Sequence, residues 1–326
     1  MVVTVFSEPV QRRYRTSVCS LAFCFHALMI VGAILVPFYV GFASRNFWLK
    51  TNTFREQPSL EFKYDMIFLL HGISTEDQSV QTWAWATNED VRDVYEPYLR
   101  APMIRAWSED DNMDGLVDRW TVAVQMPLDA SEQVLHVQAL AMFDYSLNGP
   151  AQLDMDGVVF VDYSSSMPGK SLQVEGEVKL RQRSPLSVRR TNADPALLFN
   201  AGRGLASMQS SSLGAIMGSY AKRNYTMDFT NEYKVWEIAK SRDSFSTTAG
   251  SFGLNLTVHV PVDEILYTPD LPEVLKVAWI QYFSLFALFF CLMYGLMYFV
   301  YTNQVLETLV ESDGRAPHVQ FKQHRF

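Results

Sequence analysis

The sequence predicts a membrane protein in which two transmembrane α-helices flank a mainly β ectodomain, an antiparallel β-sandwich with one amphipathic helix. Three observations support this fold class. Two long stretches contain no charged residue, apolar and polar residues alternate through much of the segment between them, and none of the three cysteines lies in that segment. An exported domain without disulfides has to rely on its own hydrophobic core.

The composition excludes several classes of protein. Of the 326 residues, 48% are hydrophobic and 19% are charged, and the formal net charge is -8. This composition is too apolar for a disordered chain, and the acidic balance argues against a nucleic-acid partner. Motifs for metal-dependent, serine-dependent, phosphate-binding or dithiol catalysis are absent from the sequence, so neither an enzyme nor a small-molecule substrate is predicted.

The first transmembrane helix is predicted over residues 17–43, after a tail of residues 1–16. The stretch Thr16–Ser44 contains no Asp, Glu, Lys or Arg. At about 1.5 Å per residue, a helix of this length exceeds the roughly 30 Å of the hydrocarbon core. A signal peptide has a shorter apolar region of about 7 to 15 residues, so an uncleaved anchor is favoured.

The second transmembrane helix is predicted over residues 277–301, before a tail of residues 302–326. It also lacks a formal charge, and its aromatic residues gather near its two ends: Trp279 and Tyr282, and Tyr298 and Tyr301. Aromatic side chains are enriched at membrane interfaces. Two spans place both tails on the same side of the bilayer.

Two sequons indicate which side that is. Asn224-Tyr225-Thr226 and Asn255-Leu256-Thr257 are the only Asn-x-Ser/Thr triplets of the sequence, and both lie between the spans. Basic residues on the two flanks of the first span nearly balance, and long loops translocate largely regardless of charge. We therefore expect residues 44–276 to be extracellular or lumenal and to carry glycans on Asn224 and Asn255, and we expect both tails to be cytoplasmic.

The segment between the spans alternates with period two, the pattern of antiparallel strands with one buried face. The clearest examples are Met66 and Phe68, Val122 and Val124, and Leu254, Leu256 and Val258. Turn clusters at Asn148-Gly149-Pro150 and Met167-Pro168-Gly169 are expected to separate strands, which favours a β-sandwich. One amphipathic helix is predicted from the spacing of Leu213, Ile216, Met217 and Tyr220.

The sharpest local motif is an acidic stretch from Asp110 to Asp118. Alternate short acids and amides with a glycine at the bend are typical of calcium loops, and calcium binds six or more oxygens. The expected ligands are Asp110, Asn112, Asp114, the carbonyl of Leu116 and Asp118. Position twelve is Thr121 instead of the bidentate Glu of an EF-hand, so a weak extracellular site is expected. The alternative is an ordinary solvated acidic turn. No other cofactor is predicted.

Several stretches together resemble the transmembrane protein 231 family. They are SEPVQRRYR before the first span, FWLKTNTFREQP after it, WSEDDNMDGLVD in the acidic loop, HVPVDEILYTPD near the end of the ectodomain and LKVAWIQYFSLF at the start of the second span. The resemblance extends over essentially the whole chain. It is weakest between Ser184 and Ser212 and in the C-terminal tail.

The resemblance implies a non-enzymatic scaffold at the ciliary transition zone. Members of this family look like subunits of the Meckel syndrome complex, which with Tectonic proteins and other membrane subunits forms a diffusion barrier at the base of the cilium. That barrier controls the entry of membrane proteins and supports ciliogenesis and Hedgehog signalling. Two alternatives outside the family are a glycosylated two-span accessory subunit of a lipid flippase and a two-span channel subunit. Both classes usually depend on ectodomain disulfides, which this segment cannot form.

Overall fold

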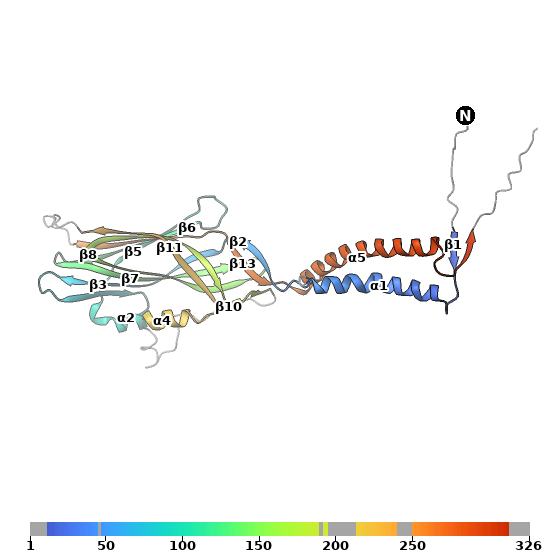
Figure 1. Ribbon diagram of the computed structural model, residues 1–326. Helices are drawn as coiled ribbons and strands as arrows, with labels where there is room; N and C mark the ends of the chain where they lie inside the picture. Colours follow the sequence, from blue (N-terminus) through green and yellow to red (C-terminus); the bar gives the residue numbers. More distant parts are fainter. Residues whose placement is uncertain (1–11, 45–46, 189–191, 195–212, 240–249, 313–326) are drawn as a thin grey trace, which may run out of the picture. The chain divides into compact units, whose positions relative to one another are not determined.

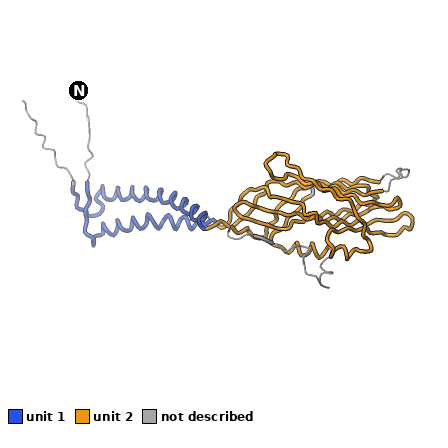
Figure 2. Tube along the Cα trace, turned by 180° about the vertical axis from the view of Figure 1, so that it is seen from behind, with its two compact units in different colours: residues 1–49, 271–326 blue, residues 50–270 orange. Residues whose placement is uncertain are grey.

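A computed structural model describes residues 12–44, 47–188, 192–194, 213–239 and 250–312 (Figure 1). The chain divides into two compact units (Figure 2). The membrane unit comprises Met1–Leu49 and Leu271–Phe326, and the β domain comprises Lys50–Asp270. Two apolar helices and a mainly β domain are therefore present as predicted.

The membrane unit is built on α1 (Leu21–Ala43) and α5 (Leu271–Thr302), which are both long and apolar enough to cross a membrane. The first helix begins four residues later than the predicted span, because the Ser20 hydroxyl accepts a hydrogen bond from the Phe23 amide at 3.2 Å and caps the helix. The second helix begins six residues earlier than predicted, so its first turns include Glu273 and Lys276.

A short two-stranded ribbon joins the segment before α1 to the segment after α5. Strand β1 (Arg12–Arg15) pairs antiparallel with β14 (Leu309–Ser312), and the Arg15 guanidinium lies 2.9 Å from the Glu311 carboxylate. The sequence predicted only tails in these positions. Four-residue strands are too short for alternation to be recognised.

The β domain contains two layers that share one long strand, β8 (Leu153–Gln182). The first layer, here called the covered sheet, has the order β4-β3-β7-β8-β10 and consists of β4 (Val80–Ala86), β3 (Ser59–Ser74), β7 (Glu132–Leu147), the first half of β8 and β10 (Asn192–Asp194). The second layer, here called the open sheet, has the order β11-β8-β12-β6-β5 and consists of β11 (Tyr225–Ile238), the second half of β8, β12 (Gly250–His259), β6 (Arg119–Leu128) and β5 (Met103–Glu109). A third, smaller sheet contains β2 (Asn52–Glu56), β13 (Asp263–Thr268) and β9 (Leu186–Ser187).

The main core is formed by apolar side chains from both layers. Phe143 is fully buried, and its ring centroid lies 5.2 Å from that of Phe62 and 6.5 Å from that of Trp120. The alternating residues of β6 and β12 point into this core, as predicted: Val122, Val124, Leu254, Leu256 and Val258 are at most 1% exposed.

The covered sheet is also buried on its outer face. There α2 (Glu89–Val94) and α4 (Leu213–Tyr220) pack on Ile67, Leu69, Leu140 and Met142 (Figure 1). The predicted amphipathic helix is therefore confirmed as α4, with Ile216 and Tyr220 buried. The Tyr220 hydroxyl accepts a hydrogen bond from the Met227 amide at 2.6 Å, which links the helix to β11.

Two details differ from the expected sandwich. Met167-Pro168-Gly169 does not end a strand, because β8 continues through it and changes partner there, from β7 before Gly169 to β11 after it. A Cβ atom at Gly169 would lie 2.1 Å from the Trp236 indole, so only glycine fits this crossing. The sheets are also mixed, because β12 and β10 pair parallel with β8.

Candidate functional site

The two apolar helices meet along a stripe of small or adaptable residues on α1. Its buried members are spaced four or seven residues apart: Ala22, Met29, Ala33, Pro37 and Gly41. Small residues allow helices in a membrane to approach closely. A Cβ atom added to Gly41 would lie 3.4 Å from the Leu285 side chain of α5 and 2.9 Å from the Phe47 ring.

Two tyrosines of α5 donate hydrogen bonds to carbonyl groups of α1. The Tyr282 hydroxyl lies 3.3 Å from the Ile34 oxygen, and the Tyr301 hydroxyl lies 3.2 Å from the Ala22 oxygen. Each phenol therefore has a partner in a region where an unsatisfied polar group is costly. One bond lies at the start of α1 and the other just past its midpoint, and together they fix the antiparallel alignment of the pair.

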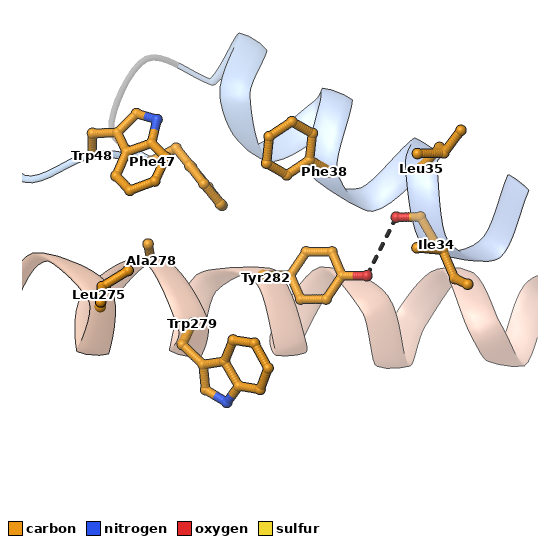
Figure 3. A pocket seen from close by; sticks show the side chains of 9 residues that line it. All are labelled: Ile34, Leu35, Phe38, Phe47, Trp48, Leu275, Ala278, Trp279 and Tyr282. Atoms are coloured by element: carbon orange, nitrogen blue, oxygen red, sulfur yellow. Dashed lines mark hydrogen bonds between the residues drawn. The ribbon is translucent and has the colours of Figure 1, made fainter. Parts of the chain in front are cut away.

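Between the helices, near the end of α1 and the start of α5, lies a groove of about 390 Å³ (Figure 3). Phe38 and Tyr282 extend into the space between the helices, and Ala278 leaves room on the α5 side. The complete lining is Ile34, Leu35, Phe38, Phe47, Trp48, Leu275, Ala278, Trp279 and Tyr282. We call this surface the membrane groove.

The lining of the membrane groove determines what can bind there. It presents apolar carbon and aromatic rings, with no ionisable group other than the Tyr282 phenol, whose hydroxyl is already bonded to α1. Such a surface can accept an acyl chain or an apolar side chain, and it cannot activate a nucleophile or bind a metal. Phe47 and Trp48 follow the first predicted span, so the charge-free stretch gave no indication that they line a groove.

Most of the remaining surface of the two helices is uncovered. On α1 the buried residues are those of the stripe described above, whereas on α5 Ala278 is the only buried residue among those described. The large apolar side chains of α5 are mostly exposed, including Trp279 at 64% and Tyr298 at 66%. Exposed apolar surface of this extent fits a lipid environment and leaves broad faces for neighbouring helices.

The predicted calcium loop lies between β5 and β6, and its acids bond mainly to its own backbone. The two carboxylate oxygens of Asp110 accept hydrogen bonds from the amides of Met113 at 2.7 Å and Gly115 at 3.0 Å. Asp118 accepts from the Gln57 side chain at 3.0 Å and from the Asp111 amide at 2.8 Å. Hydrogen bonds from Gln57 and from the loop amides lower the pKa of Asp118 below its ordinary value.

The carboxylates of the loop are directed to amide groups. Among the described residues, no group of three or more His, Cys, Asp or Glu is placed to hold a metal ion. Gly115, with φ +87°, occupies the bend that the motif assigned to glycine. The hydrogen bonds of the loop are those of a solvated acidic turn, and calcium binding stays a prediction.

Calorimetry decides between these two readings of the acidic loop. If Asp110, Asn112, Asp114, Leu116 and Asp118 form a site, titration of residues 50–270 with calcium releases or absorbs heat with a Kd of about 10⁻⁴ to 10⁻³ M. Asp114→Ala removes one carboxylate and should abolish that heat. Absence of calcium heat from the wild-type β domain would rule out the site.

The two sequons lie on exposed surface of the β domain. Asn224 is in the turn that precedes β11, and its carbonyl accepts the Arg183 amide at 3.0 Å. Asn255 is exposed on β12, between the buried Leu254 and Leu256. Both side chains are therefore accessible to an attached glycan, as the alternation predicted for Asn255.

Two histidines of the β domain lie close to each other and to polar side chains on neighbouring strands. His136 lies 2.6 Å from Asp162 and stacks on His71, whose Nδ1 lies 3.0 Å from the Thr82 hydroxyl. Burial, together with the neighbouring His136, lowers the pKa of His71. All three cysteines are free and belong to the membrane unit. These arrangements cross-link strands, and they offer no acid–base–nucleophile geometry.

Comparison with known families gives a match along nearly the whole chain. A family model described as Transmembrane protein 231 matches residues 1–310. The protein of that name from Xenopus tropicalis is 32% identical over 322 residues, which covers 98% of this chain and 98% of the relative. The protein of that name from Homo sapiens is 31% identical over 306 residues, which covers 94% of this chain and 93% of the relative.

A solved structure gives a much weaker similarity. A cryo-EM structure of a proton-activated chloride channel aligns over 86% of this chain and 98% of that chain, with a TM-score of 0.29 and 6% sequence identity. At that score the similarity carries no inference about fold or function.

Proposed function

Because the chain belongs to the transmembrane protein 231 family, we propose that it is a non-enzymatic scaffold subunit of the transition zone at the base of the cilium. Its partners are other membrane subunits of that zone, the Tectonic proteins and the Meckel syndrome complex. Together they form a diffusion barrier that controls the entry of membrane proteins into the cilium and supports ciliogenesis and Hedgehog signalling. The β domain is extracellular, and both tails are cytoplasmic.

The observation that carries this proposal is the uncovered surface of the paired helices. A monomer whose second span buries only Ala278 among its described residues offers nearly all of that span to lipid and to neighbouring subunits. A packed assembly of such spans obstructs lateral diffusion, because each membrane subunit replaces mobile lipid with an immobile obstacle. In this assembly the membrane groove receives apolar side chains of a neighbouring span.

The ectodomain adds to the same obstruction. A domain with its own core, tethered through the chain to two membrane anchors, adds bulk that hinders proteins carrying large external domains. The glycans on Asn224 and Asn255 increase this bulk. No catalytic step is needed for a barrier of this kind, and the titratable pairs of the β domain serve to hold strands together.

The two alternatives to a scaffold have less support. A flippase accessory subunit usually depends on ectodomain disulfides, and this β domain has no cysteine. A channel subunit needs a polar face on its spans, whereas the space between α1 and α5 is lined by apolar and aromatic groups. A scaffold requires neither feature.

Fluorescent tagging tests the proposed function in ciliated cells. The wild-type chain is expected to form a ring at the ciliary base and to co-purify with other transition-zone subunits. Phe38→Ala, which removes an aromatic side chain from the membrane groove, is expected to weaken both the fluorescent ring and the co-purification. Phe42→Ala is the matched control, because Phe42 is also exposed on α1, at 60%, but does not line the groove.

Three outcomes are informative. Uniform signal along the plasma membrane, without a ring, would remove the transition-zone assignment. A ring that survives both substitutions would keep the assignment and would show that the groove faces lipid instead of a partner. Loss of the ring with Phe38→Ala alone supports docking of a partner through the groove.

A further inference from the structure

The outer face of the open sheet carries a row of side chains that crosses all five strands. Trp107 on β5 faces Thr121 on β6, which faces Thr257 on β12, which faces Glu175 on β8, which faces Tyr233 on β11. Within the described residues, both helices of the β domain that cover a sheet face pack on the covered sheet instead. This row therefore lies on a face that no described helix covers.

A concavity of about 260 Å³ lies along this row. Its lining combines two aromatic rings with hydroxyl, amide and carboxylate groups: Trp107, Thr121, Gln173, Val174, Glu175, Tyr233, Asn255 and Thr257. Asn255 and Thr257 are the acceptor and the hydroxyl residue of one sequon. The glycosylation site thus lies inside the concavity and not beside it.

The two aromatic residues are held by their polar ends and expose their rings. Trp107 is 44% exposed and donates its indole N–H to the Glu109 carboxylate at 3.0 Å. Tyr233 is 48% exposed and donates its hydroxyl to Glu175, which also lies 2.7 Å from His259. Rings fixed in this way lose little conformational freedom when a ligand stacks on them.

The sequon side chains remain available for a ligand. Asn255 is exposed, and neither its amide group nor the Thr257 hydroxyl forms a side-chain hydrogen bond to the described part of the chain. Asn255 lies on β12, the central strand of the open sheet, two strands from each edge. Two strand spacings are about 10 Å, a distance that one or two sugar rings can span.

We propose that the glycan attached to Asn255 lies back on the open sheet, with its first N-acetylglucosamine in the concavity between Trp107 and Tyr233. A pyranose ring has an apolar face of C–H groups, which stacks on an aromatic ring, and a polar edge, which hydrogen-bonds. Gln173 and Glu175 supply the polar partners for that edge. The inference rests on the proposed extracellular position of the β domain.

A glycan in this position changes which surfaces can bind a partner. It covers the exposed rings of Trp107 and Tyr233, which would otherwise form an aromatic patch on an uncovered sheet. Subunits that dock on the β domain then have to use other surfaces. The glycan also ties β5, β12 and β11 together from outside, although none of these three strands is a direct neighbour of another in the open sheet.

The rate at which peptide N-glycosidase removes each glycan tests this arrangement. The experiment uses the full chain, produced in glycosylating cells and purified in mild detergent, with site-specific mass spectrometry as the readout. A packed first sugar exposes its linkage only when it lifts off, so we expect removal at Asn255 to be about tenfold slower than at Asn224. After denaturation, both sites should be cleaved at similar rates.

Two substitutions on β5 distinguish the loss of the packed sugar from a general disturbance of the fold. Trp107→Ala removes one side of the concavity. In the folded protein it is expected to raise the rate of glycan removal at Asn255 to the rate at Asn224. Met103→Ala is the control, because Met103 is also exposed on β5 but does not line the concavity. Both residues are at the surface, so both variants should fold, and their thermal melting is measured alongside.

Each contrary result has a separate meaning. Equal native rates at the two sites in the wild type, or an unchanged Asn255 rate in Trp107→Ala, would overturn the packed glycan. An occupied Asn224 with an unoccupied Asn255 would also overturn it, while leaving the extracellular position intact. If neither sequon is occupied, both the packed glycan and the extracellular position fail, whereas the ring at the ciliary base is tested independently.

Discussion

Replacing Glu132 with alanine is expected to lower the free energy of unfolding of the β domain by about 3 to 5 kcal/mol, the usual result of breaking a buried ion pair from one side. The Glu132 side chain is only 6% exposed. Its carboxylate accepts hydrogen bonds from both terminal nitrogens of Arg100, from the Trp83 indole at 3.0 Å and from the Asp129 amide at 2.7 Å. Alanine removes this acceptor from all of these donors and leaves Arg100 with only the Pro127 carbonyl at 3.2 Å and the Asp129 carboxylate at 3.8 Å.

Replacing Glu132 with glutamine distinguishes the effect of its charge from the effect of its shape. Glu132→Gln keeps the size of the side chain and one acceptor oxygen, so its cost should be smaller than that of alanine. Urea unfolding of residues 50–270, followed by tryptophan fluorescence, measures both values, since these residues form a compact unit with both hydrophobic clusters. Equal stability of the wild type and the alanine variant would contradict the role assigned to Glu132.

The same residue predicts a dependence of stability on pH. Burial raises the pKa of Glu132, but the hydrogen bonds from Arg100, Asp129 and Trp83 outweigh it and hold the pKa below the ordinary value of 4.5. A depressed carboxyl pKa stabilises the fold above the unfolded pKa and loses that contribution as pH falls through the folded value. The advantage of the wild type over Glu132→Gln should therefore persist at neutral pH and shrink below about pH 4.5.

Replacing Phe143 with alanine is expected to cost a further and independent 3 to 5 kcal/mol or so, because it opens a cavity in the main core. The Phe143 side chain is fully buried between the two layers and packs against Phe62 and Trp120. The surroundings are themselves large and rigid, so they can close only part of the space. The same urea experiment measures the loss, which should appear as a lower midpoint with an unchanged m-value.

An exposed aromatic provides the control for Phe143. Tyr98 is 50% exposed in the short 3₁₀ helix η1 (Glu96–Tyr98), and Tyr98→Ala should change the free energy of unfolding by about 0.5 kcal/mol or less. Similar losses in the two variants would mean that Phe143 does not anchor the core. A changed m-value for Phe143→Ala would indicate instead that the unfolded or native state had altered in compactness.

The parts of the fold that were predicted correctly are those whose structure follows from a single physical rule. Two long stretches without charge are compatible only with membrane spans or fully buried helices. The alternation in β12 is compatible only with a strand that has one buried face. The amphipathic spacing of α4 is equally specific. The alternation predicted an exposed side chain for Asn255, and Asn255 is exposed.

The parts that it missed depend on contacts between distant segments. The run Met66–Leu70 is apolar on both faces, and period-two reasoning cannot say that α2 and α4 cover its second face. Pro168-Gly169 is usually a turn, yet here the Trp236 indole requires the glycine inside a continuous strand. The membrane groove and the concavity at Asn255 were also missed, because each combines residues from elements far apart in the chain.

The pairing of β2 with β13 has a mechanical consequence. The chain runs from α1 into β2 and from β13 into α5, so a force that pulls the two helices apart acts on Asn52 and Tyr267, which are paired at the same end of the two strands. In this geometry the strands unzip one pair at a time instead of shearing together. The first pair is also joined by its side chains, because the Asn52 amide donates to the Tyr267 hydroxyl at 3.1 Å. Lateral tension in the membrane would therefore load this pair, together with the pairing of Tyr267 and Thr268 to β9, before it reached the core of the β domain.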